Sequence, residues 1–149
     1  MNKYAPYALC RAVSAICPDI QSQVKCGVQA CERSLWWELS TCILSSQVPY
    51  SLAVSAANAV DAKELLLDEK TEIYVLYQKL LDVLVTPLDV EGRLRKYRFP
   101  DKRSRQVSIA RQIVSKEYGT LTNFLENSLD AVEARTWLIN HVPGIGPKQ

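Results

Sequence analysis

Histidine, methionine and glycine are scarce in this chain of 149 residues, which has one histidine, one methionine and five glycines. A single histidine excludes a metal centre built from several imidazoles. The few glycines, with seven prolines, exclude a chain dominated by low complexity or linkers. Long apolar runs are also missing, since none approaches the roughly 18 to 20 residues that cross a bilayer. We therefore expect no membrane anchor and no signal peptide.

The five cysteines are an odd number, and their spacing is not that of a small disulfide-bonded domain. Free thiols fit a reducing compartment, which predicts a cytoplasmic protein. Cys10 and Cys17 share a C-x6-C spacing with some iron–sulfur loops, but the C-x2-C-x5-C continuation does not follow. No metal site is predicted.

Charge is divided unevenly along the chain, although the net charge is only +2. The segment from Arg93 to Arg111 holds eight basic residues and one acid, Asp101. The segment from Asp61 to Glu91 holds eight acids and three lysines. A partner that carries many phosphates would be attracted to the first segment and repelled by the second. The alternative is that the basic segment is a solvated helix face.

Apolar residues recur with helical spacing, and the alternation typical of strands is rare, so we predict an all-α domain. Expected helices begin at an N-cap Ser34, after Pro49, near Thr71, at an N-cap Asp101 and near Asp130. Pro87 and Gly119 are expected to end the third and fourth helices. Residues 1–33 form an expected N-terminal helix and loop of unknown role, and residues 34–149 form the helical domain. The predicted apolar faces contain Leu35, Leu39, Cys42 and Ile43; Ile73, Leu76, Tyr77, Leu80, Leu81 and Leu84; Val107, Ile109, Ala110, Ile113 and Val114; and Ala131, Ala134, Trp137 and Leu138.

The sequence VPGIGPK at residues 142–148 predicts a tight turn between two helices. Gly144 and Gly146 can adopt positive φ and leave their amides uncovered, and Pro147 suits the first position of a helix. Uncovered amides beside a helix N-terminus bind phosphate, so this helix-hairpin-helix pattern favours contact with a nucleic acid backbone. Ile145 is expected to anchor the turn to the core. A plain loop between helices is the alternative.

Lys148 follows this turn. An amine in the first turn of a helix has its charged form disfavoured by the helix dipole, which lowers its pKa. The neutral amine could attack the anomeric carbon of a sugar, displace a base and form a Schiff base. This requires a helix that continues past Gln149. The alternative is a lysine that contacts phosphate without catalysis.

Three blocks of this sequence resemble helix-hairpin-helix DNA glycosylases, most closely the short archaeal-type (second class) 8-oxoguanine DNA glycosylase/lyases. The blocks are WWELSTCILSSQ, KYRFPDKRSRQVSIARQIV and EARTWLINHVPGIGPKQ, in the order that the family shows. The resemblance implies that Lys148 is the Schiff-base nucleophile. It implies that Pro143, Gly144, Ile145 and Gly146 hold a backbone phosphate, with a possible monovalent cation and no other cofactor.

The same resemblance gives a role to Gln47, which follows the first apolar helix. In the wider superfamily the polar residue at this place enters the duplex and fills the gap left by a flipped nucleotide. A solvent-facing glutamine at a helix end is the alternative.

Supporting roles follow for the basic and aromatic residues around KYRFPDKR. Arg98, Lys102, Arg103 and Arg105 are placed near the pocket or the DNA backbone, where they would raise affinity and its salt dependence. Tyr97 and Phe99 are candidate walls of the base pocket, or core aromatics. Trp36 and Trp37 cannot both be buried on one helix face, so Trp36 is a further candidate for stacking on a ligand.

These features predict a nucleoid-associated DNA repair enzyme that excises an oxidised purine, 8-oxoguanine above all, and then cleaves the strand by β-elimination. Its partner would be double-stranded DNA containing a damaged base. Family members continue past the hairpin lysine with a helix and an assisting aspartate, whereas this sequence ends at Gln149. A shortened chain, or a second polypeptide that supplies the rest, is expected. The alternatives are a non-catalytic DNA-binding module and one half of a two-chain glycosylase.

Overall fold

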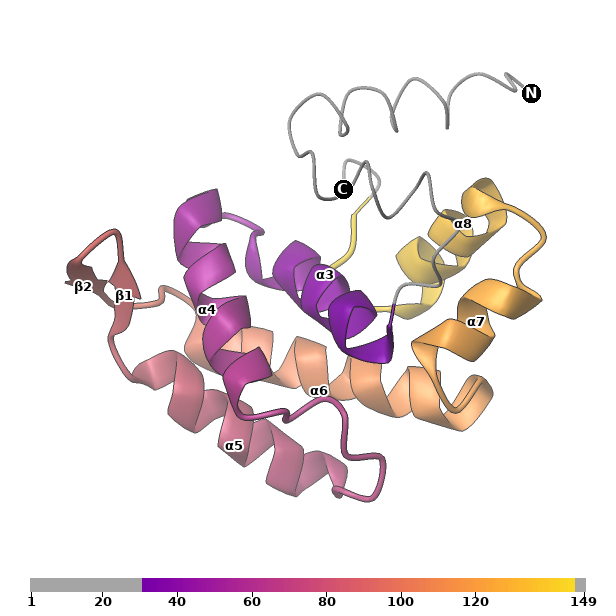
Figure 1. The fold of residues 1–149 in the computed structure, drawn as a ribbon, viewed down its shortest axis with the longest axis horizontal. Helices are drawn as coiled ribbons and strands as arrows, with labels where there is room; N and C mark the ends of the chain where they lie inside the picture. Colours follow the sequence, from indigo (N-terminus) through magenta and orange to yellow (C-terminus); the bar gives the residue numbers. More distant parts are fainter. Residues whose placement is uncertain (1–30, 147–149) are drawn as a thin grey trace. The chain divides into compact units, whose positions relative to one another are not determined.

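A computed structural model describes residues 31–146, and its internal contacts divide the chain after Cys31. All elements below belong to the unit that begins at Glu32, and the predicted division between residues 33 and 34 stays a prediction. Helices dominate this unit, as Figure 1 shows, and the all-α prediction is confirmed. Within the described residues no helix has the length and hydropathy to span a membrane. The elements are α3 (Glu32–Leu44), α4 (Tyr50–Ala62), α5 (Ile73–Val85), β1 (Leu88–Val90), β2 (Arg93–Arg95), α6 (Pro100–Glu117), α7 (Leu121–Asn127) and α8 (Ala131–His141).

Helices α3 and α4 pack closely because α4 presents small side chains. Ala53, Ala56 and Ala57 are at most 1% exposed, and such residues allow two helix backbones to approach. Pro49 precedes the first residue of α4, as predicted. Two predictions for α3 were wrong. The helix begins at Glu32, before Ser34, and Cys42 is exposed rather than part of the apolar face.

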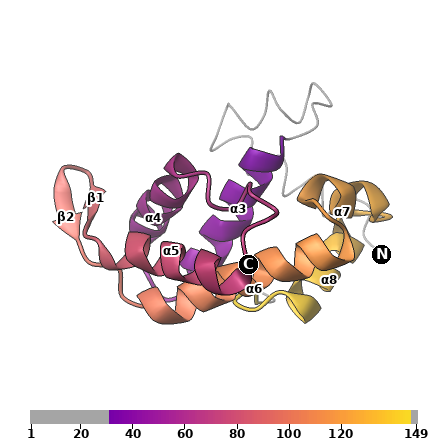
Figure 2. The same cartoon turned by 90° about the horizontal axis from the view of Figure 1, so that it is seen from below.

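Helices α5 and α6 lie side by side, as Figures 1 and 2 both show. Their contact buries the predicted apolar residues Leu76, Leu80, Leu84, Val107, Ala110 and Val114. Asp101 is not the N-cap of α6, because the helix begins at Pro100 with Phe99 as the capping residue. The Asp101 carboxylate instead accepts a hydrogen bond from the Tyr77 hydroxyl of α5. That bond holds the pKa of the Asp101 carboxyl below its usual range.

Helix α7 was not predicted, and its start depends on a residue distant in sequence. The Glu32 carboxylate of α3 accepts hydrogen bonds from the amides of Leu121 and Thr122, at 2.7 and 2.9 Å. A carboxylate here satisfies first-turn donors and is stabilised by the helix dipole. Helix α8 begins beside Asp130, as predicted, and Asp130 is its N-cap, because the Asp130 side chain accepts from the amide of Glu133 at 2.8 Å.

The antiparallel hairpin of β1 and β2 was also missed. Its two-residue turn is Glu91 and Gly92, with φ of 54° and 81°, which is the turn that matches the twist of paired strands. Leu88 and Val90 of β1 are buried and contact α4, whereas all three residues of β2 are exposed. The hairpin therefore adds little to the core and presents β2 to solvent.

Candidate nucleic-acid interface

The hairpin turn after α8 lies directly against α3 and α6. Gly144 has a φ of +89°, and a Cβ atom at this position would lie 3.0 Å from the Ile43 side chain and from Gln106 Oε1. Only a glycine combines this conformation with so close an approach. Ile145 packs against the core, as predicted. Residues 147–149, which include Lys148, lie outside the described residues.

Gln47 lies in the turn that follows α3, and its side chain is exposed. Its φ is +63°, a left-handed conformation that a non-glycine residue adopts only when its surroundings hold it. Two buried side chains hold the carbonyls of this turn. The Tyr97 hydroxyl donates to the Leu44 carbonyl at 2.7 Å, and Arg103 Nη2 donates to the Ser46 carbonyl at 2.9 Å.

The Gln47 turn and the hairpin turn share their supports. Ile43, one turn of helix before Gln47, contacts Gly144. Gln106, the other neighbour of Gly144, accepts a hydrogen bond from the same Arg103 that holds Ser46. Two segments about 100 residues apart in the sequence therefore meet through α3 and α6. Sequence reasoning missed Ser46 and Gln106; the i, i+3 spacing of Arg103 and Gln106 on one helix was the available signal.

The basic residues divide into exposed and buried ones. Arg98, Lys102 and Arg105 are exposed, as phosphate contacts must be, although Arg105 Nε lies 3.3 Å from the Asp101 carboxylate. Arg103 is only 3% exposed, so the expectation that it contacts DNA directly is wrong. Arg111 is also buried, and its Nε donates to the Leu66 carbonyl at 2.7 Å. Burial therefore removes two of the eight cations from the basic surface.

The aromatic candidates for a base pocket are largely part of the core. Trp36 and Tyr97 are 3% and 5% exposed, so neither offers a face on which a base could stack. Trp36 also donates to Glu32 and lies under the Arg111 guanidinium. Phe99 is partly buried, with the guanidinium carbons of Arg98 and Arg103 at 4.9 and 5.7 Å from its ring centre. Of the three, only Phe99 keeps exposed surface beside the cations.

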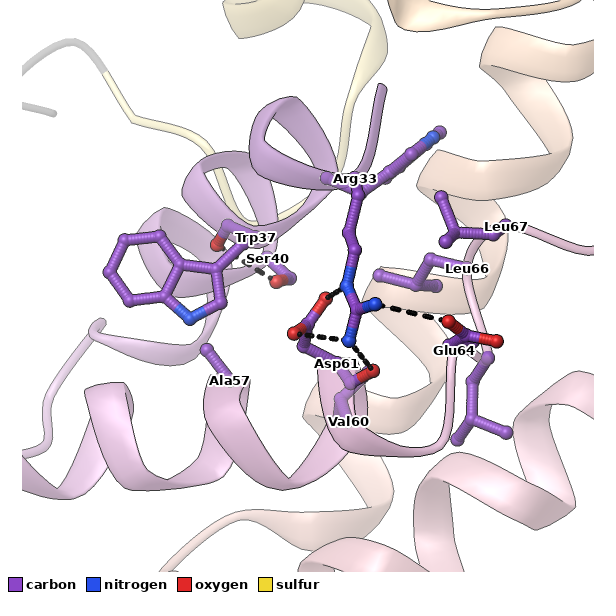
Figure 3. A pocket seen from close by; sticks show the side chains of 11 residues that line it. Arg33, Trp37, Ser40, Ala57, Val60, Asp61, Glu64, Leu66 and Leu67 are labelled. Atoms are coloured by element: carbon purple, nitrogen blue, oxygen red, sulfur yellow. Dashed lines mark hydrogen bonds and ion pairs between the residues drawn. The ribbon is translucent and has the colours of Figure 1, made fainter. Parts of the chain in front are cut away.

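A small pocket that Trp36 and Trp37 help to line also contains an ion-pair network, which Figure 3 shows around Arg33. Arg33 binds both oxygens of Asp61, at 2.8 and 3.0 Å, and reaches Glu64 at 3.0 Å. The volume of this pocket is about 10 Å³, which is at most enough for one water molecule. A nucleobase cannot enter it. In the described part of the chain no cluster of three or more metal-ligating side chains occurs either.

Burial of Tyr97 predicts a pH dependence of stability. Burial raises the pKa of Tyr97 to about 12. Its neutral form is therefore favoured in the folded state, and this contribution is lost as the pH rises from about 10 towards 12. Between pH 9 and 11.5, we expect the free energy of unfolding of the wild type to fall about 2 kcal/mol further than that of Tyr97→Phe. Urea titrations at both pH values measure the difference. A constant gap between the two proteins would show that this hydroxyl is solvated.

The structure thus seats the glycine turn against α3 and α6, beside an exposed residue in left-handed conformation. The Ogg-HhH family, described as 8-oxoguanine DNA glycosylase, matches residues 19–149. The chain belongs to this family of DNA glycosylases, and its partner is therefore DNA. No curated protein and no solved structure matches the chain.

Proposed function

We propose that this protein excises an oxidised purine, 8-oxoguanine opposite cytosine, from double-stranded DNA and then cleaves the strand at the resulting site. The observation that carries the proposal is the shared support of the Gln47 turn and the hairpin turn by Ile43, Arg103 and Gln106. The first turn would fill the gap left by the flipped nucleotide, and the second would bind the backbone beside it.

Lys148 is the proposed nucleophile. Its neutral amine attacks C1′ of the flipped nucleotide, and the bond from C1′ to the base breaks with its electron pair leaving on the base. The sugar ring opens, the ring oxygen takes a proton, and a Schiff base joins Lys148 to C1′. Loss of a proton from C2′ then expels the 3′ phosphate by β-elimination. A carboxylate is proposed to assist these proton transfers.

The hairpin suits a monovalent cation better than a divalent one. Residues Pro143 to Gly146 carry no carboxylate and offer only main-chain carbonyl oxygens. Such neutral donors match a single positive charge. We propose that a bound cation would join these carbonyls to a DNA phosphate.

Borohydride trapping tests the proposed activity. The full chain is incubated with a duplex that contains 8-oxoguanine opposite cytosine, and borohydride reduces any Schiff base to a stable adduct. We expect an adduct with the strand that carries the lesion and none with undamaged duplex. Salt-sensitive binding without an adduct or base release would instead indicate a non-catalytic DNA-binding module. Activity that returns only with a second polypeptide would indicate one half of a two-chain glycosylase.

A further inference from the structure

Arg103 is buried in the first turns of α6, yet it makes no ion pair within residues 31–146. Its Nη1 donates to Gln106 Oε1 at 2.6 Å and its Nη2 donates to the Ser46 carbonyl at 2.9 Å. Its Nε is buried without a hydrogen-bond partner. A buried charge with incomplete compensation is costly, so stability alone gives no reason for an arginine here.

The Ser46 carbonyl belongs to the peptide group that joins Ser46 to Gln47. A hydrogen bond to this oxygen therefore fixes the orientation of the peptide plane that precedes the Gln47 Cα atom. Gln47 needs such support, because its φ of +63° is disfavoured for a residue with a side chain. Tyr97 holds the Leu44 carbonyl of the same turn, but that bond acts three residues earlier. Arg103 is the nearer support.

The second bond of Arg103 reaches the hairpin. Gln106 Oε1, which accepts it, is the atom that a Cβ at Gly144 would meet at 3.0 Å. The amide group of Gln106 is thus fixed by Arg103 while it lies against the glycine turn. A continuous series of contacts runs from Ser46 through Arg103 and Gln106 to Gly144.

We propose that Arg103 is a positioning residue, which fixes the Gln47 turn relative to the hairpin turn so that both engage DNA in one geometry. This rests on the proposed function, in which Gln47 enters the duplex and the hairpin binds the backbone. The planar guanidinium suits the task because it reaches two acceptors at once in a fixed geometry. Arg103 itself touches no DNA.

The neighbouring Lys102 provides a matched comparison, because it lies on the same helix turn but is exposed. The test uses the full chain and a duplex with 2-aminopurine opposite a tetrahydrofuran abasic-site analogue, which cannot react with an amine. Salt dependence of binding reports phosphate contacts, and the rise in 2-aminopurine fluorescence reports entry of a side chain into the stack. Lys79→Met on α5 is the control for loss of an exposed lysine elsewhere.

For Arg103→Met we expect the salt dependence of DNA binding to stay unchanged. We expect the equilibrium constant for unstacking of 2-aminopurine to fall roughly tenfold, because a charged hydrogen bond to the Gln47 turn is lost. For Lys102→Met we expect the reverse. The slope of the logarithm of the binding constant against the logarithm of the salt concentration falls in magnitude by about one, and the fluorescence rise at saturation is kept. Arg103→Lys should behave like Arg103→Met, because an ammonium cannot hold both acceptors in the same planar geometry. Lys79→Met should match the wild type.

The outcomes separate the two proposals. If the wild type binds DNA without raising the 2-aminopurine fluorescence, the proposed entry of Gln47 into the duplex is wrong, whatever the variants do. If the wild type does raise the fluorescence, two results for folded Arg103→Met overturn the positioning role. One is a fluorescence rise equal to that of the wild type, and the other is a reduced salt dependence of DNA binding. Thermal melting checks folding. If Arg103→Met does not fold, Arg103→Lys decides by the same criteria, and Gln106→Met, which removes one acceptor, decides if neither arginine variant folds.

Discussion

Replacement of Lys148 by glutamine is expected to abolish the covalent adduct that borohydride traps on DNA containing 8-oxoguanine. The lone pair on the side-chain amide nitrogen of glutamine is delocalised into the carbonyl group, so the nitrogen is not a nucleophile and no Schiff base can form. Loss of a residue that makes the covalent bond commonly lowers turnover by roughly 10³-fold or more. Gel electrophoresis of the adduct, with wild-type protein in parallel, measures the effect.

Lys148→Arg is the matched control for the charge of this residue. A guanidinium stays protonated, so it can contact phosphate but cannot attack C1′. We expect Lys148→Arg to keep the affinity for DNA and its salt dependence while it loses the adduct as completely as Lys148→Gln. An adduct that persists in both variants would assign the chemistry to another amine of the chain.

Gly144→Ala is expected to cost roughly 2 to 4 kcal/mol in the free energy of unfolding. One part is the φ of +89°, which costs about 1 to 2 kcal/mol for a residue with a side chain. The other part is the approach of the new methyl group to Ile43 and Gln106 at 3.0 Å. Because Gln106 accepts a hydrogen bond from Arg103, any shift of its side-chain amide is transmitted to Arg103 and thus towards the Gln47 turn. Urea unfolding measures the loss.

Two other glycines separate these contributions. Gly92 has a φ of +81° but nothing within 4 Å of an added Cβ, so Gly92→Ala should show only the conformational cost of about 1 to 2 kcal/mol. Gly146 has no positive φ, and nothing lies within 4 Å of a Cβ added there, so Gly146→Ala should lie within about 0.5 kcal/mol of the wild type. Equal losses for Gly144→Ala and Gly92→Ala would show that the hairpin turn has room against α3 and α6.

Sequence alone predicted the helices whose ends are marked by local signals. Pro49 before α4 and Asp130 before α8 act on residues next to them, so the sequence contains what determines those ends. Helix α7 has only seven residues, too few for a periodic pattern. Its N-cap Thr120 is a local signal, but Glu32, which also stabilises its start, lies 89 residues from Leu121. No local rule could connect them. The hairpin of β1 and β2 was missed because its three-residue strands are too short to alternate visibly.

The site shows the same division between local and distant causes. Gly144 and Ile145 were predicted from the glycine pattern, and the structure places them against the core as that pattern requires. The resemblance to the family placed Arg103 near the pocket or the DNA backbone, whereas its side chain is 3% exposed. Its burial follows from the Ser46 carbonyl, which lies 57 residues away and becomes a neighbour only in the folded chain. Tyr97 was left undecided between pocket and core for the same reason, and it lies in the core.

The exposed strand β2 affects how this protein behaves at high concentration. Among residues 31–146, one side of β2 carries no partner strand, and such an edge can serve as a template for a second chain, especially beside Leu94, which is 75% exposed. Arg93, Arg95 and Lys96 cluster at this edge and are exposed. Two copies that approach edge to edge at β2 would bring these like charges together. We expect their repulsion to oppose aggregation through this strand.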